Sequence, residues 1–102
     1  MSRYVLAPAA QEDLVAIRDY YLKEAGYRIA RQMLVEFTKA FQTSAHTPAI
    51  GHPREDLAGD RPVLFWPMRD YLIIYRSVTK PVEIVTVVRG SRDVAMILRR
   101  RG

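Results

Sequence analysis

Apolar residues recur three or four positions apart in two stretches of the first half of the chain, which is the spacing of helices that bury one side. The first apolar face comprises Ala10, Leu14, Ile17 and Tyr21, and the second comprises Ala30, Met33, Phe37, Ala40 and Phe41. Gly26 separates the two faces and can adopt the left-handed conformation that ends helices. Thr47-Pro48 ends the second stretch, because the residue before a proline resists helix. The pattern therefore predicts an antiparallel helical hairpin.

Short stretches of β-branched and aromatic residues predict four strands around the hairpin. They are Tyr4-Val5-Leu6 near the start and, after a loop rich in proline and glycine, residues 63–66, 71–78 and 82–89. Pro67 predicts that the strand at 63–66 ends at a sheet edge or a bulge. The short turns between the later strands predict antiparallel neighbours. A short helix from Asp93 to about Leu98, with Ser91 as its N-cap, is expected to close the chain.

The element order β-α-α-β-β-β-α predicts an α+β fold of two layers, with the helical hairpin packed on one face of a mainly antiparallel sheet. The two long strands are apolar at nearly every position, which indicates that both of their faces are partly covered. The second face is then either open or covered in part by the last helix and by a partner. Because the chain has 102 residues and no linker, one domain over residues 1–102 is expected.

The composition excludes several kinds of site. The chain contains no cysteine, which excludes disulfides, cysteine nucleophiles and thiolate metal sites. His46 and His52 lie in or beside the proline-rich loop without a clustered second ligand, and no glycine pattern typical of a phosphate-binding loop occurs. No apolar run reaches the roughly 18–20 residues of a membrane helix, and no stretch resembles a signal peptide. We expect a soluble cytoplasmic protein without metal, cofactor or membrane partner.

Charge changes the picture more than any other property of the composition. The net charge is +5, and 13 of the 16 basic residues are arginine. Residues 54–102 carry ten basic and six acidic groups, whereas residues 1–53 carry six and five. Because a guanidinium forms paired contacts with carboxylates and phosphates, this excess indicates an acidic partner, either nucleic acid or an acidic protein surface. A solvated basic face without a partner is the alternative.

Four segments, in matching order and spacing, resemble the ParE/RelE superfamily of bacterial type II toxins, and most closely its ParE branch. They are the opening strand and helix at 4–21, the loop Thr47–Gly51 with Arg54–Leu57, the strand Tyr71–Arg76 and the closing segment Val85–Asp93. The resemblance covers nearly the whole chain and implies a RelE/ParE-like fold. It also implies a toxin that a cognate, ParD-like antitoxin neutralises in a hetero-oligomer.

The superfamily contains two activities, and the residues favour one of them. ParE-like members are associated with inhibition of DNA gyrase by binding, whereas RelE-like members cut messenger RNA on the ribosome. RNA cleavage needs a group that accepts the 2′-hydroxyl proton, and RelE-like members often carry a tyrosine or histidine near the C-terminus for it. Ala95 stands there in this chain, no Tyr, His or Lys follows Lys80, and arginine is a poor base. We therefore expect a gyrase inhibitor without catalytic residues, with an RNA nuclease or a basic binding module without toxicity as alternatives.

Two sets of residues are candidates for contacts with these partners. The target-binding set comprises Arg54, Arg61, Arg76, Arg89, Arg92, Arg99, Arg100 and Arg101, and direct contact with nucleic acid is compatible with it. Internal pairing is the structural alternative, above all between Arg54 and Asp56. The antitoxin-binding set comprises Leu14, Ile17, Tyr21, Phe37 and Trp66, which would form an apolar groove of the hairpin and sheet edge or the core beneath that groove.

Overall fold

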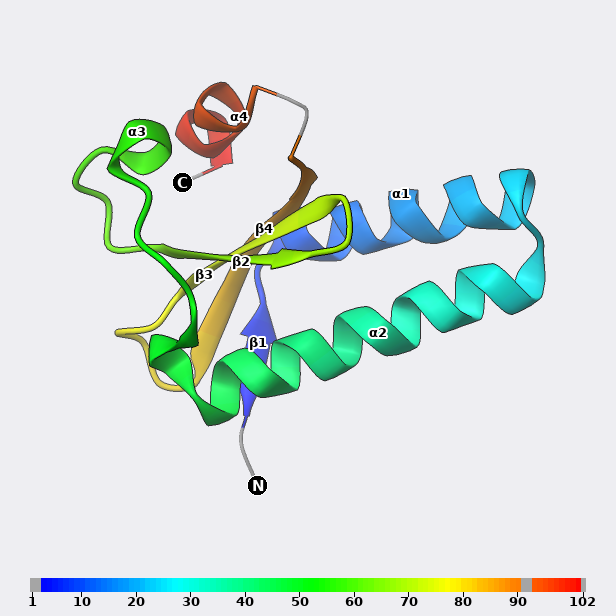
Figure 1. Cartoon of the computed structure of the whole chain (residues 1–102), viewed down its shortest axis with the longest axis horizontal. Coiled ribbons are helices and arrows are strands. Elements are labelled where there is room, and N and C mark those ends of the chain that lie inside the picture. The colour runs from blue at the N-terminus through cyan, green and yellow to red at the C-terminus, as the bar shows by residue number, and fades with distance from the viewer. Residues whose placement is uncertain (1–2, 91–92, 102) are drawn as a thin grey trace.

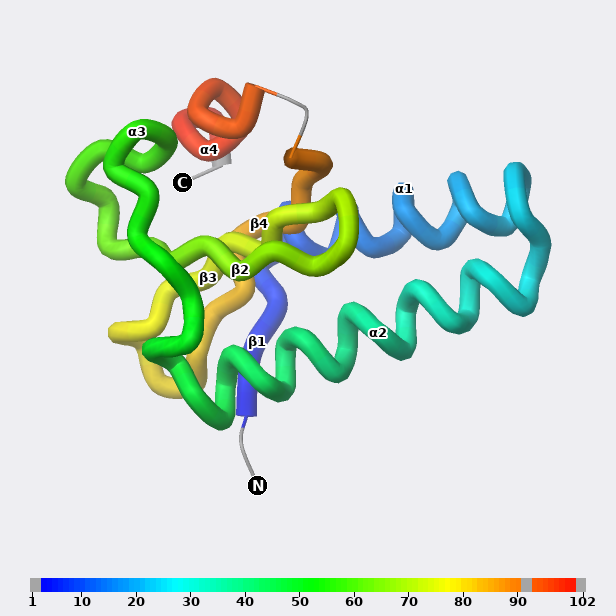
Figure 2. Tube along the Cα trace, viewed as in Figure 1, coloured from blue at the N-terminus to red at the C-terminus, as the bar shows by residue number. Residues whose placement is uncertain are grey.

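The structure, a computed structural model, describes residues 3–90 and 93–101 and confirms the predicted α+β class (Figure 1). In chain order the elements are β1 (Tyr4–Leu6), α1 (Pro8–Glu24), α2 (Tyr27–His46), the 3₁₀ turn η1 (Pro48–Ile50), α3 (Glu55–Ala58), β2 (Leu64–Met68), β3 (Tyr71–Arg76), β4 (Val82–Arg89) and α4 (Val94–Arg101). The predicted hairpin is formed by α1 and α2, which run side by side and project beyond the sheet at their linked ends (Figure 2).

The strands form one mixed sheet in the order β1-β4-β3-β2. Only β1 pairs in parallel, with β4, and the other pairs are antiparallel as predicted. Pro67 lies opposite Leu72 within β2, which continues to Met68 rather than ending at Trp66. A proline is tolerated there because β2 is an edge strand whose outer side needs no donor. β3 is shorter than predicted and ends at Arg76.

Gly26 makes the reversal between the two long helices. Its φ of 90° lies in the region that glycine adopts without a side-chain penalty. Its backbone N–H donates to the Tyr21 carbonyl at 2.9 Å, which satisfies an acceptor in the last turn of α1. The predicted helix-ending role of Gly26 is confirmed, and it lets α2 return along α1.

Two apolar clusters lie on opposite faces of the sheet. The cluster between the sheet and the hairpin includes Phe37 and Ile73, and the cluster beneath α3 and α4 includes Phe65, Ile74 and Leu98. Adjacent side chains of β3 therefore pack into different clusters, because successive side chains of a strand point to opposite faces of the sheet. The expectation that both faces of the long strands are covered is confirmed, and within the chain α4 with α3 covers the second face.

The loop predicted between the hairpin and the later strands contains two helical turns, η1 and α3. The Tyr75 hydroxyl on β3 donates to the Pro48 carbonyl at 2.7 Å and accepts the Gly51 N–H at 2.9 Å. Leu57 and Ala58 of α3 pack into the cluster beneath α4. These turns escape the sequence pattern because contacts with distant segments, rather than helical periodicity, hold them.

The start of α4 has a different cap from the expected one. Asp93 Oδ1 accepts the Met96 N–H at 3.1 Å, so Asp93 satisfies a free donor of the first turn. The predicted cap, Ser91, lies outside the described residues. The helix thus begins directly after Asp93, close to where the sequence predicts it.

The pairing of β3 with β4 contains one β-bulge. Ile74 pairs with Thr86 whereas Tyr75 pairs with Ile84, which leaves Val85 as the extra residue of β4. A bulge bends its strand and changes where the following side chains point. Here the extra residue comes directly before Thr86 and Val87, which form hydrogen bonds with Asp13 of α1.

Candidate functional site

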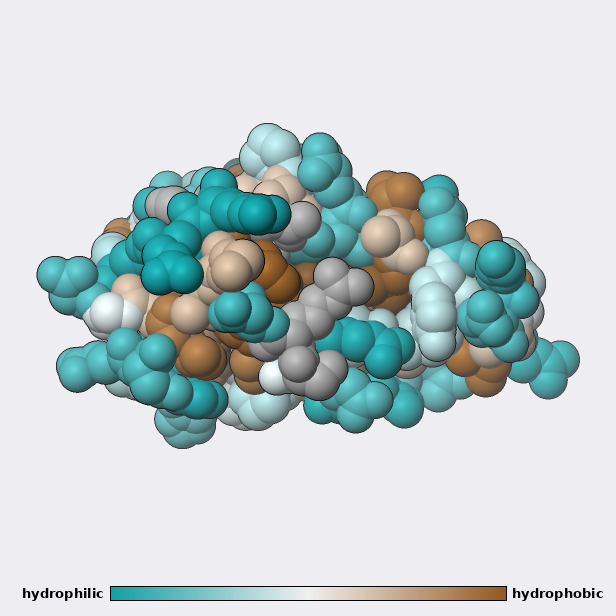
Figure 3. Space-filling view, turned by 90° about the horizontal axis from the view of Figure 1, so that it is seen from above, coloured by the Kyte–Doolittle hydropathy of each residue, from teal (hydrophilic) through white to brown (hydrophobic). Residues whose placement is uncertain are grey.

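A cleft of about 660 Å³ opens between α1, the adjoining ends of β3 and β4, and α4. Its apolar walls come from Ala16, Ile17, Val87, Val88 and Ile97, and its polar side chains are Asp13, Tyr20, Tyr71, Arg89 and Arg100. Small-molecule sites span roughly 300–1,000 Å³, so this volume can hold a ligand of that size. The view from the α4 side shows apolar surface lying between hydrophilic side chains across this face (Figure 3).

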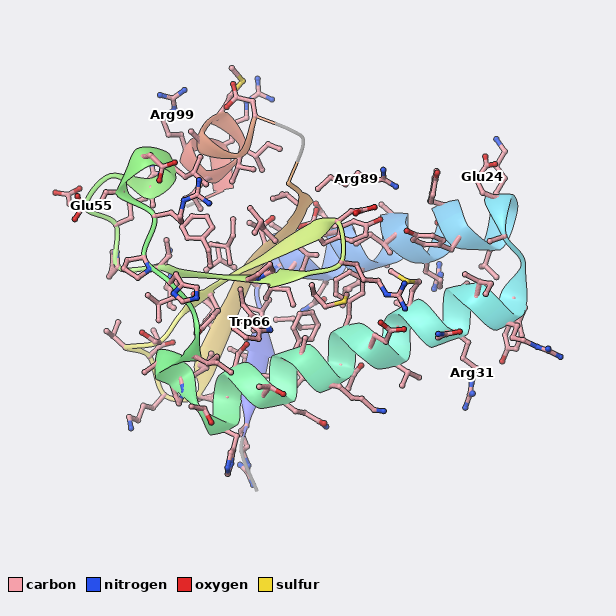
Figure 4. The ribbon with its side chains drawn as sticks, viewed as in Figure 1. Glu24, Arg31, Glu55, Trp66, Arg89 and Arg99 are labelled. Atoms are coloured by element: carbon pink, nitrogen blue, oxygen red, sulfur yellow. The ribbon has the colours of Figure 1, made fainter. Side chains whose placement is uncertain are left out.

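Arg89, the last residue of β4, lies against two tyrosine rings of the cleft. Its Cζ atom is 5.4 Å from the ring centroid of Tyr20 and 5.5 Å from that of Tyr71, which is within the range of cation–π attraction. Tyr20 on α1 is 48% exposed, whereas Tyr71 is 4% exposed. Figure 4 shows Arg89 on the side of α1 that faces away from α2. The guanidinium is thus positioned by two elements besides its own strand.

The protonation states of the cleft follow from burial. Desolvation is the main reason that the pKa of Tyr71 is raised to about 12, and the Tyr21 hydroxyl, 3.4 Å away, acts in the same direction while Arg89 opposes it. Contact with Tyr71 in turn raises the pKa of the Arg89 guanidinium. At neutral pH the cleft therefore contains a neutral tyrosine, whose hydroxyl donates to that of Tyr21, and a fixed cation, and neither group accepts a proton readily.

Asp13 is the carboxylate of the cleft, and it binds the bulged strand. Its Oδ2 accepts the Thr86 hydroxyl at 2.6 Å and the Val87 N–H at 2.9 Å. Hydrogen bonds to an ionised acceptor are stronger than neutral ones, so this pair of bonds ties α1 firmly to β4. Asp13 Oδ2 therefore points towards β4 of the same chain.

The arginines differ in whether a carboxylate accompanies them. Four form ion pairs: Arg18, Arg54, Arg69 and Arg76. Neither Arg89 nor Arg100 pairs with a carboxylate among the residues that the structure describes. A cation in a partly apolar cleft attracts anions more strongly than one exposed to bulk water. The cleft is therefore suited to bind an anionic group.

The predicted target-binding arginines do not gather at one place. Arg89 and Arg100 line the cleft, and Arg99 is exposed on the same helix as Arg100 (Figure 4). Arg54 forms two hydrogen bonds with Asp56, at 3.0 and 2.8 Å, which is the internal pairing that the sequence raised as an alternative. Arg54 directly precedes α3, and no residue of that loop lines the cleft.

The remaining members of this set are spread further. Arg76 Nε lies 3.2 Å from Glu83 Oε1 across the β3–β4 pair. Arg61 is half-buried in the loop before β2. Arg92 and the side chain of Arg101 lie outside the described residues. Of the six members of this set whose side chains the structure describes, two, Arg89 and Arg100, line one cleft.

The predicted antitoxin-binding residues all belong to or border the cluster beneath the hairpin. Phe37 is fully buried and Ile17 is 8% exposed, so both are core. Leu14, Tyr21 and Trp66 are partly buried and pack against that core. Figure 4 shows Trp66 between the sheet and α2. The sequence left open whether these residues form the groove or the core beneath it, and Phe37 and Ile17 belong to the core.

Two residues of the cleft do not stand out in the sequence as site residues. There, Asp13 is only an acidic residue early in a helix, and Tyr20 is only an aromatic residue of core type. Asp13, Ile17 and Tyr20 follow one another at spacings of four and three, so they share a helical face beside the buried one. That spacing is the signal that could have placed them together with the basic end of β4.

Within residues 3–90 and 93–101, no three or more His, Cys, Asp or Glu side chains gather in a way that could hold a metal ion. None of the helices described is both long and apolar enough to span a membrane.

Comparisons with known proteins agree with the fold. The sequence model of the family described as "ParE toxin of type II toxin-antitoxin system, parDE" matches residues 4–94. Among solved structures, the "Chromosomal ParDE TA system from P. aeruginosa" is similar with a TM-score of 0.72 and 19% identity, over 87% of this chain and 96% of that chain. A search of curated proteins finds no match. The resemblance drawn from the sequence and the RelE/ParE-like fold that it implied are both confirmed.

Proposed function

Because the chain belongs to the ParE toxin family of type II toxin–antitoxin systems, we propose that it inhibits DNA gyrase by binding and that a ParD-like antitoxin neutralises it. The observation that supports binding is the cleft around Arg89, a guanidinium set against Tyr20 and Tyr71 without a described carboxylate partner. Arg100 adds a second cation at the same cleft. Such a surface is complementary to an acidic one.

The chemistry of the cleft favours binding over RNA cleavage. With a pKa of about 12, Tyr71 keeps its proton at neutral pH and cannot serve as a general base. Arg89 is a permanent cation, and the Asp13 carboxylate accepts two hydrogen bonds from β4. The cleft could hold a phosphate, but Tyr71, Arg89 and Asp13 do not supply the general base and general acid that cleavage of RNA needs.

The hairpin is the surface that we assign to the antitoxin. Among the described residues, nine large apolar side chains are exposed, and six of them lie on α1 and α2: Val15, Tyr20, Leu22, Tyr27, Ile29 and Val35. Tyr27, at the start of α2, is 72% exposed. Exposed apolar side chains gathered on one projecting unit are typical of a protein interface. The matching family and the similar solved structure are both named for a parDE or ParDE system, which supports an antitoxin of this kind.

The gyrase proposal is tested with the purified toxin in two assays. In a supercoiling assay we expect gyrase activity to fall as toxin is added, and Arg89→Ala to require roughly tenfold more toxin for the same inhibition. Arg31→Ala is the matched control, because Arg31 is exposed on α2 and points away from Arg89 (Figure 4). It removes the same charge and should inhibit as the parent does.

The second assay presents ribosomes with a bound messenger RNA to the same protein. Intact RNA together with inhibited gyrase supports the proposal. Unchanged supercoiling at saturating toxin together with cleaved RNA would replace it with the RelE-like activity.

The antitoxin proposal needs its own measurement. Capture of the toxin by a ParD-like antitoxin should weaken in a Leu22→Asp and Tyr27→Asp double variant, since both side chains are exposed on the hairpin. Val78→Asp is the matched control, because Val78 is an exposed apolar residue between β3 and β4, away from the hairpin. Equal capture of all three proteins would contradict this assignment.

A further inference from the structure

We propose that the Arg89 cleft binds a segment of single-stranded nucleic acid, with a phosphate held by Arg89 and Arg100 and a base stacked on Tyr20. The inference goes beyond inhibition of gyrase, because it assigns a ligand to the toxin itself and holds whichever protein is the target. It rests on three features of the cleft: its cations, its aromatic wall and its size.

The cations of the cleft are placed for a phosphate. Arg89 is held against two tyrosine rings, at 5.4 and 5.5 Å, so little side-chain freedom is left to lose when an anion binds. Arg100 lines the same cleft from α4. Neither is paired with a carboxylate in the described part of the chain, whereas four other arginines are. A guanidinium offers a phosphate two parallel donors.

The aromatic wall is placed for a base. Tyr20 is half exposed although the Arg89 Cζ atom lies over its ring, 5.4 Å from the centroid, so part of the ring remains accessible to a base. The ring meets that of Tyr21 edge to face at 5.1 Å, which fixes its orientation on α1. Ala16 and Ile17, one helical turn earlier, continue the same wall as apolar surface. A base that stacks on such a ring leaves its phosphate on the polar side of the cleft, which is the arrangement common in proteins that bind single strands.

The size and charge of the cleft favour a nucleotide over two other ligands, a duplex segment and an acidic peptide. A volume of about 660 Å³ admits a nucleotide, whereas the bases of a duplex are stacked in its interior and offer the Tyr20 ring no free face. An acidic peptide would satisfy Arg89 and Arg100 but would leave Tyr20 and the apolar wall without a partner. Asp13 also lines the cleft, yet its Oδ2 is bonded to Thr86 and Val87 of β4. These observations favour a ligand with one phosphate beside a planar ring.

The test measures binding of fluorescently labelled octamers to the full-length toxin by anisotropy, with a deoxyribose and a ribose oligonucleotide of the same sequence. Binding by the first alone identifies the ligand as DNA, and binding by both identifies recognition of phosphate and base without the 2′-hydroxyl. One phosphate neutralised in the cleft predicts that log K falls with log salt at a slope of about −0.7. An octamer of glutamate that competes as well as the oligonucleotides would overturn the stacking part of the proposal.

Variants separate the two halves of the ligand. Arg89→Ala should weaken binding roughly tenfold and make the salt dependence shallower, since the phosphate loses one of its two cations. Tyr20→Ala should weaken binding roughly tenfold while leaving the slope unchanged, and Tyr20→Phe should bind as the parent does because it keeps the ring. Arg31→Ala, which removes an equal charge far from the cleft, is the control.

Three outcomes would refute the site. They are no binding of either octamer, equal weakening by Arg89→Ala and Arg31→Ala, and full binding by Tyr20→Ala. Circular dichroism of each variant establishes that it is folded, and Tyr20→Ala changes a half-exposed side chain, so it remains informative if Arg89→Ala does not fold. The oligonucleotide assay contains no gyrase, so a failure to bind nucleic acid leaves the gyrase proposal untouched. Likewise, unchanged supercoiling in the gyrase assay leaves the nucleic-acid proposal untouched.

Discussion

The Asp13 carboxylate accepts a 2.9 Å hydrogen bond from the backbone N–H of Val87, which ties α1 to β4 beside the β-bulge. The two residues are 74 positions apart in the chain. The same oxygen accepts the hydroxyl of Thr86, a residue that is fully buried. This contact fixes the wall of the cleft that carries Tyr20 relative to the strand that carries Arg89.

Replacing Asp13 by alanine is expected to destabilise the protein by about 2–3 kcal/mol, because a buried hydroxyl and a backbone N–H lose a charged acceptor. The measurement is the free energy of unfolding from urea denaturation. Glu12→Ala, which removes a neighbouring exposed carboxylate from the same helix, should change that free energy by less than about 0.5 kcal/mol. Similar losses in both variants would mean that only the helix, and not the contact with β4, is affected.

The pKa of Tyr71 predicts how stability changes in alkaline solution. Its folded-state pKa of about 12 lies above the ordinary value of 10.0. Its contribution to stability is therefore present below pH 10 and is lost as the pH rises towards 12, because the unfolded chain releases the proton first. We expect the wild-type protein to lose on the order of 1–2 kcal/mol more than Tyr71→Phe over this interval.

Urea denaturation of both proteins at a series of pH values measures that difference. Tyr75, whose pKa is also raised by burial, is present in both and cancels in the comparison. Parallel curves for the two proteins would show that Tyr71 titrates normally in the folded state.

Gly51 is predicted to tolerate no side chain. A Cβ atom at this position would lie 2.6 Å from the Tyr75 hydroxyl oxygen and 3.0 Å from the Leu64 Cβ. Gly51→Ala should therefore cost about 1–3 kcal/mol of unfolding free energy. In a Tyr75→Phe background the hydroxyl is absent, so the same substitution should cost less. A double-mutant cycle measures this coupling, and strictly additive costs would contradict the contact.

Arg69 combines a strained backbone with an ion pair, and two variants separate the effects of these two features on stability. Its φ is 55°, and its guanidinium forms two 2.7 Å hydrogen bonds with Glu36 on α2. Arg69→Ala loses the pair and keeps the left-handed backbone, whereas Arg69→Gly loses the pair and relieves the backbone. We expect the glycine variant to melt a few degrees above the alanine variant. Equal melting temperatures would show that the turn relaxes by itself.

In cells, Arg89→Ala is expected to reduce growth inhibition by the toxin while leaving the fold intact, because Arg89 presents its charge at the cleft rather than to an internal carboxylate. Arg54→Ala should matter less, since Arg54 is engaged with Asp56. Growth after induction at equal protein level is the readout. Arg31→Ala is the control for loss of charge, and full toxicity of Arg89→Ala would show that the cleft has no part in the activity.

Local patterns were sufficient for much of the fold. The apolar faces of α1 and α2, the break at Gly26 and the strands after the loop depend on residues within a few positions of one another, and the structure confirms them. The pairing of Arg54 with Asp56, two residues apart, was also among the alternatives. The four-residue helix α3 was missed because a segment so short has no periodicity, and its packing beneath α4 comes from residues more than thirty positions later.

The sequence by itself determined the family, the helical hairpin, the mainly antiparallel sheet and the concentration of arginine in the second half, because each depends on residue type and short-range order. Only the tertiary structure decided which arginines share a site. The bulge in β4, the packing of α1 against it and the return of α4 bring Tyr20, Tyr71, Arg89 and Arg100 together around one cleft. That arrangement depends on the register of strands and on contacts across more than seventy residues, which no local pattern of side chains encodes.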